Sequence, residues 1–207
     1  NFFFGVGASA AYTDPNYQTG GIRIYGTDHK VYNNYMQNLT GTTWLLPILL
    51  DSGDTTGIKG NGHQRPMNVT IVNNTFVNNA GGIAVGSANY STQPSANVIA
   101  NNIVVGSSGT LYDKHASTCN TFAGNLAFAS GAAVPGASNI NGDPVLQSVT
   151  ENTYSLQKLS AGSSLAINAE QGSYPFVITD MDGETRSTPD IGADEYSASS
   201  NPVINPL

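Results

Sequence analysis

Short apolar segments recur along the chain, separated by polar residues and glycine. Apolar and polar positions alternate in IRIY at 22–25 and again in KVYN at 30–33, on either side of the polar segment 26–29. A period of two over four residues is typical of a β-strand, and the polar segment between them is typical of a turn. No stretch of ten or more residues follows the helical period convincingly. The pattern therefore predicts an all-β chain.

A motif in which a strand ends in Asn-Asn and an apolar residue follows occurs several times. Clear copies are VYNNYM at 31–36, TIVNNTFVNN at 70–79 and VIANNIVVG at 98–106, with degenerate copies NFFFG at 1–5 and NTFAGNLAF at 120–128. The equivalent asparagines Asn34, Asn74, Asn102 and Asn125 are 40, 28 and 23 residues apart. Spacings of this size are those of solenoid repeats, in which each unit buries its apolar face against its neighbours.

Asparagines at the same corner of successive repeats can hydrogen-bond to one another through their amides. We therefore expect a right-handed single-stranded parallel β-helix, with Asn34, Asn74 and Asn102 along one line. The alternative is a β-sandwich of antiparallel strands, although its strands recur at shorter and more regular spacing. The varying repeat length places insertions in loops, notably at 38–66, where a solenoid usually carries its function.

The sequence changes character beyond residue 142. We expect residues 1–197 to form the coils, with 142–197 as a terminal cap that closes the last coil, and 198–207 to form a tail. Carboxylates gather in the cap, as calcium ligands do, but their spacing does not match an EF-hand loop, so we expect no metal site there. These acidic residues are Asp180, Asp182, Asp190, Asp194 and Glu195.

Charge and cysteine content narrow the possible functions. Charged residues make up 10% of the chain and the net charge is −7, which argues against a nucleic-acid surface. The single Cys119 excludes an intramolecular disulfide and a cysteine-rich zinc site, and we expect it to be a buried thiol. No apolar run approaches the ~18 residues of a membrane span. Because the chain begins with Asn1 rather than Met, we expect a further segment before it.

Two motifs carry a family resemblance. The stretch GGIRIYGTDHKVYNNY at 20–35, with NFFFG before it and RPMNVTIVNNTFVNN after it, resembles polysaccharide lyase family 6, which contains alginate lyases and chondroitinase B. The later DIGADEY at 190–196 also closes other secreted parallel β-helix proteins, so it indicates the fold more than the activity. The resemblance covers nearly the whole chain and implies a secreted or periplasmic bacterial protein.

The resemblance implies cleavage of a uronic-acid polysaccharide, most of all alginate, by β-elimination. In the family a lysine takes the C5 proton, an arginine assists in the acid role, and calcium offsets the uronate charge. The family positions of these two residues and of the calcium ligands lie before Asn1. We therefore expect them in an N-terminal β-helix half, covalent or separate. The present chain is then expected to supply substrate-binding coils and to be inactive alone.

Arg23 occupies the family position of a substrate-binding arginine, whose planar fork can hold a uronate carboxylate in bidentate fashion. The alternative is an arginine bonded to carbonyls at the sheet edge. Alternation predicts that Ile22 and Ile24 pack inside while Arg23 points outward, so that removing Arg23 should barely change folding. Another substrate-binding candidate is His29, which matches a family histidine but lies at a turn and could instead bond the backbone. His63 and Arg65 could line the same groove or lie in a surface loop, and Tyr12 and Tyr17 could stack on sugars.

Two other kinds of function stay open. A β-helical glycoside hydrolase of the polygalacturonase type needs paired carboxylates, and Asp28 and Asp54 are the acids expected near Arg23. The signatures of that family, Asn-Thr-Asp and Arg-Ile-Lys, are absent from the sequence. The second alternative is a non-catalytic carbohydrate-binding or structural β-helix, which would keep the binding residues without the chemistry.

Overall fold

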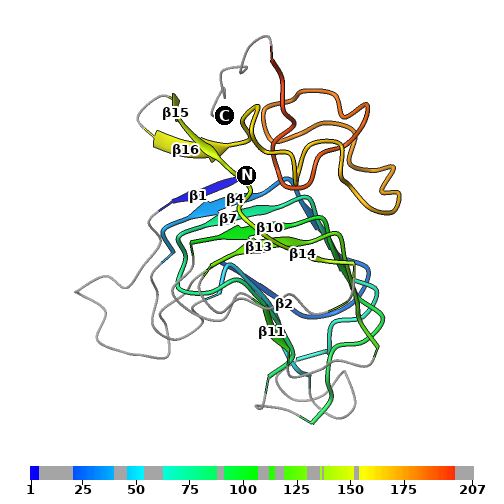
Figure 1. The fold of residues 1–207 in the computed structure, drawn as a ribbon. Coiled ribbons are helices and arrows are strands. Elements are labelled where there is room, and N and C mark those ends of the chain that lie inside the picture. Colours follow the sequence, from blue (N-terminus) through cyan, green and yellow to red (C-terminus); the bar gives the residue numbers. More distant parts are fainter. Residues whose placement is uncertain are drawn as a thin grey trace, which may run out of the picture.

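The computed structural model describes a chain built from β-strands (Figure 1). The residues described are 1–4, 21–39, 46–53, 63–87, 91–106, 112–114, 119–129, 136, 138–151 and 154–198. These ranges contain no helix, as the apolar pattern predicted. They accordingly include no helical segment that is long and apolar enough to span a membrane. Tyr12, Tyr17 and Asp54, which the sequence singled out, lie outside the described residues.

Three parallel sheets each receive one strand from successive repeats. Sheet A has the order β1 (Phe2–Phe4), β4 (Tyr35–Gln37), β7 (Thr75–Val77), β10 (Ile103–Val105), β13 (Leu126–Phe128) and β14 (Ile140–Asn141). Sheet B contains β2 (Ile22–Ile24), β5 (Ile48–Leu50), β8 (Ile83–Val85) and β11 (Tyr112–Lys114). Sheet C contains β3 (Lys30–Tyr32), β6 (Thr70–Val72), β9 (Val98–Ala100) and β12 (Thr121–Ala123).

All neighbouring strands within these three sheets pair in parallel, which confirms the expected repeat and argues against the antiparallel sandwich. Among the described strands, only β15 (Gln147–Glu151) and β16 (Tyr154–Lys158) pair in an antiparallel hairpin. The chain passes from sheet B to sheet C to sheet A and then starts the next repeat. Each repeat therefore presents equivalent residues at the same place on the stack.

The inward residues of the three sheets form one apolar core. Ile24 and Ile48 of sheet B, Ile71 of sheet C and Phe76 of sheet A are buried in the same cluster, against which Ile22 also packs. Successive side chains in a strand point to opposite faces, so the residue between two core positions must face outward. In β2 that residue is Arg23, which is exposed. The predicted orientation of this strand is confirmed.

A row of stacked asparagines runs along the corner between sheets C and A. Asn34 Nδ2 donates to Asn74 Oδ1 at 2.8 Å, and Asn74 Nδ2 donates to Asn102 Oδ1 at 2.8 Å. The same amide contact links six residues, Asn1, Asn34, Asn74, Asn102, Asn125 and Asn139, and we call this row the asparagine ladder. The line of asparagines predicted from the repeat is therefore confirmed.

The first asparagine of each Asn-Asn pair has a different task. Asn33, Asn73 and Asn101 have φ values of 52°, 53° and 52°, in the left-handed region that asparagine tolerates better than most residues. Gly124 takes the same place in the degenerate repeat, with φ 62°. The motif thus pairs a residue that turns the chain with a residue that stacks on the next repeat.

Residues 142–151 and 154–198, which we call the terminal segment, lie against the outer side of sheet A (Figure 1). The turning asparagines hold this segment, because Asn33 Nδ2 donates to the carbonyl of Thr179 at 2.5 Å and Asn101 Nδ2 donates to that of Gln171 at 3.0 Å. Tyr35 Oη also accepts a hydrogen bond from the amide of Gln157 at 2.8 Å. The segment therefore runs along several repeats. Its closure of the last coil as a cap stays a prediction.

Cys119 is exposed, and the expectation of a buried thiol is wrong. The residue lies in the connection before β12, and its carbonyl accepts a hydrogen bond from the amide of Ala96 at 2.6 Å. By the register of sheet C, Cys119 takes the place before β12 that Asn68 takes before β6 and Ala96 before β9. All three residues are exposed, so this place on each repeat faces solvent.

Candidate functional site

Arg23 contacts a buried carboxylate that belongs to the next repeat. Arg23 Nε donates to Asp51 Oδ2 at 2.9 Å, and Nη2 of the same guanidinium also donates to this oxygen. The Asp51 side chain is 0% exposed, whereas 33% of the Arg23 side chain is exposed. The guanidinium therefore lies between a buried anion and the solvent-facing side of sheet B. Whether Arg23 binds substrate or serves the structure alone stays a prediction.

Asp51 accepts further hydrogen bonds from three neighbours. Tyr25 Oη donates to Oδ2 at 2.7 Å, while the amide of Ser52 and the hydroxyl of Ser87 donate to Oδ1 at 2.8 and 2.5 Å. Burial acts to raise the pKa of Asp51, but the hydrogen bonds from Ser87, Tyr25, Arg23 and Ser52 together lower it below its ordinary value. Asp51 is consequently held in its ionised form.

Two histidines lie beside this cluster. The His63 ring stacks on the Tyr25 ring, with centroids 4.7 Å apart and an interplanar angle of 10°. His29 Nε2 is 2.8 Å from the carbonyl oxygen of Tyr25, which agrees with the backbone-bonded alternative for this residue. The Arg23 guanidinium carbon also lies 5.0 Å from the centre of the Tyr25 ring. Tyr25 is thus the common neighbour of Arg23, His29 and His63.

Arg65 reaches the same edge through its backbone. The segment after the long insertion returns there, because the amide of Gly26 donates to the carbonyl of Gln64 at 2.9 Å. The Arg65 backbone lies so close to Gly53 that a Cβ on this glycine would be 2.3 Å from the Arg65 nitrogen. The structure therefore brings Arg23, His29, His63 and the backbone of Arg65 together. A role for each in substrate binding stays a prediction.

Asp51 was missed by the sequence analysis, which named Asp28 and Asp54 as the acids near Arg23. The register explains how it could have been found, because Ile22, Arg23 and Ile24 pair with Ile48, Leu49 and Leu50. The residue after β2 is Tyr25 and the residue after β5 is Asp51, so the two occupy the same place on successive repeats. Aligning IRIY with ILLD would have revealed the pair. Asp28 itself is exposed.

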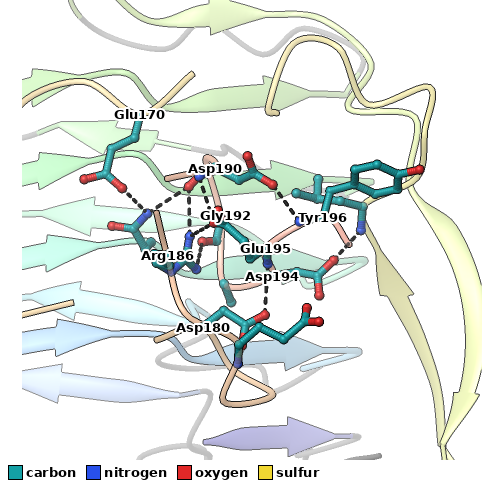
Figure 2. A network of polar contacts seen from close by, with 12 residues as sticks. Glu170, Asp180, Arg186, Asp190, Gly192, Asp194, Glu195 and Tyr196 are labelled. Atoms are coloured by element: carbon teal, nitrogen blue, oxygen red, sulfur yellow. Dashed lines mark hydrogen bonds and ion pairs between the residues drawn. The ribbon is translucent and has the colours of Figure 1, made fainter. Parts of the chain in front are cut away.

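A second polar cluster lies in the terminal segment (Figure 2). Arg186 donates to the Asp190 carbonyl at 3.1 Å and the Gly192 carbonyl at 2.8 Å, and pairs with Glu195 at 3.2 Å. Asn73 of the stack donates to the carboxylate of Glu170 at 3.1 Å. The amide of Ala193 also donates to Thr75 Oγ1 of β7 in sheet A at 2.9 Å. This contact joins the DIGADEY motif to the stack, so the motif has a structural role.

Oxygens of Asp180, Asp182 and Asp194 lie within 4.8 Å of one another, an arrangement that a cation can favour. Asp182, however, accepts from Lys158 Nζ at 2.5 Å, and this ammonium also pairs with Glu151. Asp180 accepts from the amides of Asp182, Glu184 and Glu195. The ammonium and the backbone donors occupy most of these carboxylate oxygens, while Asp182 Oδ1 is buried without a hydrogen-bond partner. Because the Lys158 ammonium already offsets the charge of Asp182, we assign no chemistry to a metal here.

Two sizeable pockets lie away from Arg23. One of about 420 Å³ is lined by Lys30, Tyr32 and Asp180 among others, near the first residue of the chain. Another of about 410 Å³ lies in the terminal segment beside Glu170, Tyr174 and Arg186. Arg23 lines neither of these two pockets.

Comparison with known protein families gives one match. Residues 10–93 match the family model described as Chondroitinase B, which is less than half of the chain. The matched span includes Arg23, His29, His63 and Arg65, together with both tyrosine candidates. A search of curated proteins returned no match.

Solved structures with a similar fold are described as alginate lyases. The PL6 family alginate lyase AlyGC is 22% identical, with a TM-score of 0.58 over 92% of this chain and 24% of that chain. A mutant of the same enzyme gives the same values. A PL6 alginate lyase in complex with a trisaccharide is 18% identical, with a TM-score of 0.45 over 88% of this chain and 41% of that chain.

The family model and the shared fold confirm the resemblance to polysaccharide lyase family 6, to which alginate lyases and chondroitinase B belong. The chain spans only 24% of the length of the alginate lyase just described. At 22% identity this similarity shows the fold alone and does not establish a substrate or an activity for the chain.

Proposed function

We propose that this chain forms the substrate-binding coils of a polysaccharide lyase that cleaves a uronic-acid polysaccharide, alginate in the first place, by β-elimination. In this proposal the three sheets are the faces of a right-handed parallel β-helix, and the catalytic lysine and arginine and the calcium ligands belong to coils before residue 1. The observation that carries the proposal is Arg23, one-third exposed on the outer face of sheet B within the span matched by the Chondroitinase B model.

The chemistry of uronate polymers explains why such a face is useful. Each sugar carries a carboxylate, and β-elimination removes the proton at C5 and breaks the C4–oxygen bond, leaving a double bond between C4 and C5. The C5 proton is scarcely acidic until the adjacent carboxylate charge is offset, which calcium does when bound in the complete enzyme. Residues of this chain would hold the neighbouring sugars in place. Charge-assisted contacts from a guanidinium suit that purpose.

The other candidates support the same face. His63 stacks on Tyr25, and the end of the 38–66 insertion returns to this edge through Gln64. The outer face of a stack of repeats suits a long polymer, which must extend past the reacting sugar in both directions. A polysaccharide substrate of this kind is found outside the cytoplasm, which is consistent with a secreted or periplasmic protein.

The test compares the products formed by the present chain and by a longer protein that includes the preceding coils. Absorbance of the 4,5-unsaturated product identifies a lyase, whereas new reducing ends without that absorbance identify a hydrolase. We expect no turnover of alginate by residues 1–207 alone and lyase turnover by the longer protein. Robust turnover by the isolated chain would show that its own residues perform the chemistry and would overturn the proposed division.

A non-catalytic carbohydrate-binding module is the second candidate, and the positions of two lysines favour it for the isolated chain. Lys158 is buried in ion pairs with Glu151 and Asp182, and Lys30 Nζ lies 4.3 Å from the centre of the Phe176 ring. Neither lysine is placed beside Arg23 as a base. If the longer protein binds alginate without forming either product, the binding module is the better description.

A further inference from the structure

One buried oxygen atom fixes the orientation of two side chains on the sheet B face. Asp51 Oδ2 accepts from Nε and Nη2 of Arg23 and from Oη of Tyr25. Tyr25 in turn carries the stacked His63 ring. Asp51 itself does not reach solvent, because its side chain is 0% exposed. A sugar chain on this face would therefore meet Arg23, and Asp51 would act from behind it.

The carboxylate is itself held by other repeats and cannot turn freely. Its second oxygen accepts from the amide of Ser52 at 2.8 Å and from the hydroxyl of Ser87, which follows β8 in the next repeat. The Ser87 hydroxyl is 2.6 Å from the Ser52 hydroxyl. The backbone carbonyl of Ser87 accepts a hydrogen bond from Gln93 Nε2 at 2.8 Å. A chain of hydrogen bonds thus connects the arginine of one repeat to two further repeats.

This arrangement matters because arginine is a long side chain with many rotamers. Binding a ligand with a mobile side chain costs the entropy of ordering it, and holding it beforehand removes much of that cost. A guanidinium is also planar, so fixing the Nε and Nη2 edge sets the plane in which its other N–H groups point. The exposed third of the Arg23 side chain is then presented to solvent in one orientation.

We propose that Asp51 is a positioning residue that orients Arg23 and Tyr25 toward a uronate carboxylate on the outer face of sheet B. The inference rests on the proposed function for the choice of ligand. It goes beyond that function by assigning part of the recognition to a residue that the substrate does not touch. The same contact could have the opposite role. In that case Asp51 competes with the substrate anion for Arg23, because its charge weakens the attraction between Arg23 and that anion.

The two roles differ in the sign of one effect. Asp51→Asn keeps the size of the side chain and an acceptor oxygen but removes the charge. If Asp51 positions Arg23, this variant should bind oligouronate about 10-fold more weakly, a change equivalent to one charge-assisted contact at the low end of its range. If Asp51 competes for Arg23, the same variant should bind more tightly, because the guanidinium charge is released.

The experiment titrates ¹⁵N-labelled chain 1–207 with a defined oligouronate and follows the Arg23 Nε–H resonance together with the affinity. In the original chain we expect a resonance protected from solvent exchange, as a donor to a buried carboxylate should be. Asp51→Asn should lose this protection along with affinity, and Asp51→Glu should restore part of both. Asp28→Asn is the matched control, since Asp28 is an exposed acid on the turn after β2, and it should change neither.

Ser87→Ala provides a milder variant in case Asp51→Asn does not fold. It keeps the Asp51 charge but removes one of the hydrogen bonds that fix the Asp51 carboxylate. It should weaken binding less than Asp51→Asn does and raise the exchange rate at Arg23 Nε–H. Unchanged or tighter binding in Asp51→Asn or Ser87→Ala overturns the positioning role. If the original chain binds no oligouronate while Asp51→Asn still abolishes the protection at Arg23, the proposed function fails and Asp51 orients Arg23 for stability alone.

Discussion

The asparagine ladder and the terminal segment bury polar groups in opposite ways. The ladder uses neutral amides, since each buried side chain is satisfied by the next copy of itself. The terminal segment uses charges, with Lys158 fully buried against Glu151 and Asp182, and Arg186 against Glu195. An uncharged ladder can be extended by any number of repeats. In a buried charged cluster, by contrast, positive and negative side chains must offset one another locally.

This difference predicts which region makes the stability of the protein depend on pH. The ladder has no group that titrates, so its contribution to stability should not depend on pH. In the terminal segment, burial raises the pKa of Asp194 to about 8 and that of Asp182 to about 6, against the hydrogen bonds and the charge of Lys158 that lower them. Stability in the two regions should therefore respond differently to substitution and to pH.

The largest effect is expected for Lys158→Met, which keeps the length of the side chain and removes the charge. The carboxylates of Glu151 and Asp182 would then stay buried without their cation. Breaking a buried ion pair from one side typically costs about 3–5 kcal/mol. The free energy of unfolding in urea measures this loss. Lys30→Met, at an exposed lysine, is the control and should cost about 1 kcal/mol or less; equal losses in both variants would contradict the account.

The asparagine ladder should show the next largest effect. Asn74→Ala removes the acceptor used by Asn34 and the donor to Asn102 in a buried row. Each buried polar group left without a partner costs about 1–3 kcal/mol, so we expect a loss of about 2–4 kcal/mol. The loss should be the same at pH 5 and pH 8, which sharpens the contrast with the terminal segment. Asn141→Ala, at an exposed asparagine of β14, should cost far less.

Docking of the terminal segment on sheet A can be tested at a glycine. A Cβ on Gly192 would lie 2.6 Å from Ile103 Cδ1 and 2.9 Å from Thr75 Oγ1, and its φ is 99°. Gly183 has a similar φ of 93° with no atom within 4 Å of such a Cβ. Both alanine variants therefore carry backbone strain, but only Gly192→Ala also overpacks the interface. The melting difference between them should correspond to about 1–3 kcal/mol, and no difference would mean that the segment docks loosely.

The last prediction concerns the pH dependence of stability rather than a loss at one pH. Because the pKa of Asp194 rises from 3.8 to about 8 on folding, the folded chain holds a proton that the unfolded chain has lost between these values. This contribution is therefore fully present below pH 3.8 and is lost as the pH rises toward 8. Asp194→Asn should reduce that loss in urea unfolding across the pH range. Parallel pH curves for the two proteins would contradict the assignment.

Most of the stack could be predicted from the sequence, because the Asn-Asn motif contains both the residue that turns the chain and the residue that stacks on the next repeat. In Asn33-Asn34 the first residue turns the chain and the second joins the ladder, and each repeat copies this pair. Alternation around Arg23 likewise predicted its outward direction. The burial of Lys158 could not be predicted in this way, since Glu151, Asp182 and Lys158 share no local pattern. Their meeting depends on how the hairpin and the last loop fold onto each other.

One expectation about Arg23 has to be corrected. Its removal was expected to leave folding almost unchanged, because an outward side chain carries little core packing. The structure pairs Arg23 with Asp51, which is 0% exposed and would lose its charge partner in Arg23→Ala. We now expect a loss of about 1–3 kcal/mol in stability as well as weaker binding. Local alternation predicts which way a side chain points, but not which residue of the next repeat it meets.

The central claim is that the Arg23 face of sheet B recognises the carboxylates of a uronic-acid polymer. The most direct measurement is the calorimetric affinity of the chain for an oligouronate and for the same oligosaccharide with its carboxyl groups reduced to alcohols. The account predicts binding of the oligouronate, at least about 10-fold weaker binding of the reduced sugar, and loss of this preference in Arg23→Ala. Equal affinity for both sugars, or a preference that survives in Arg23→Ala, would contradict it.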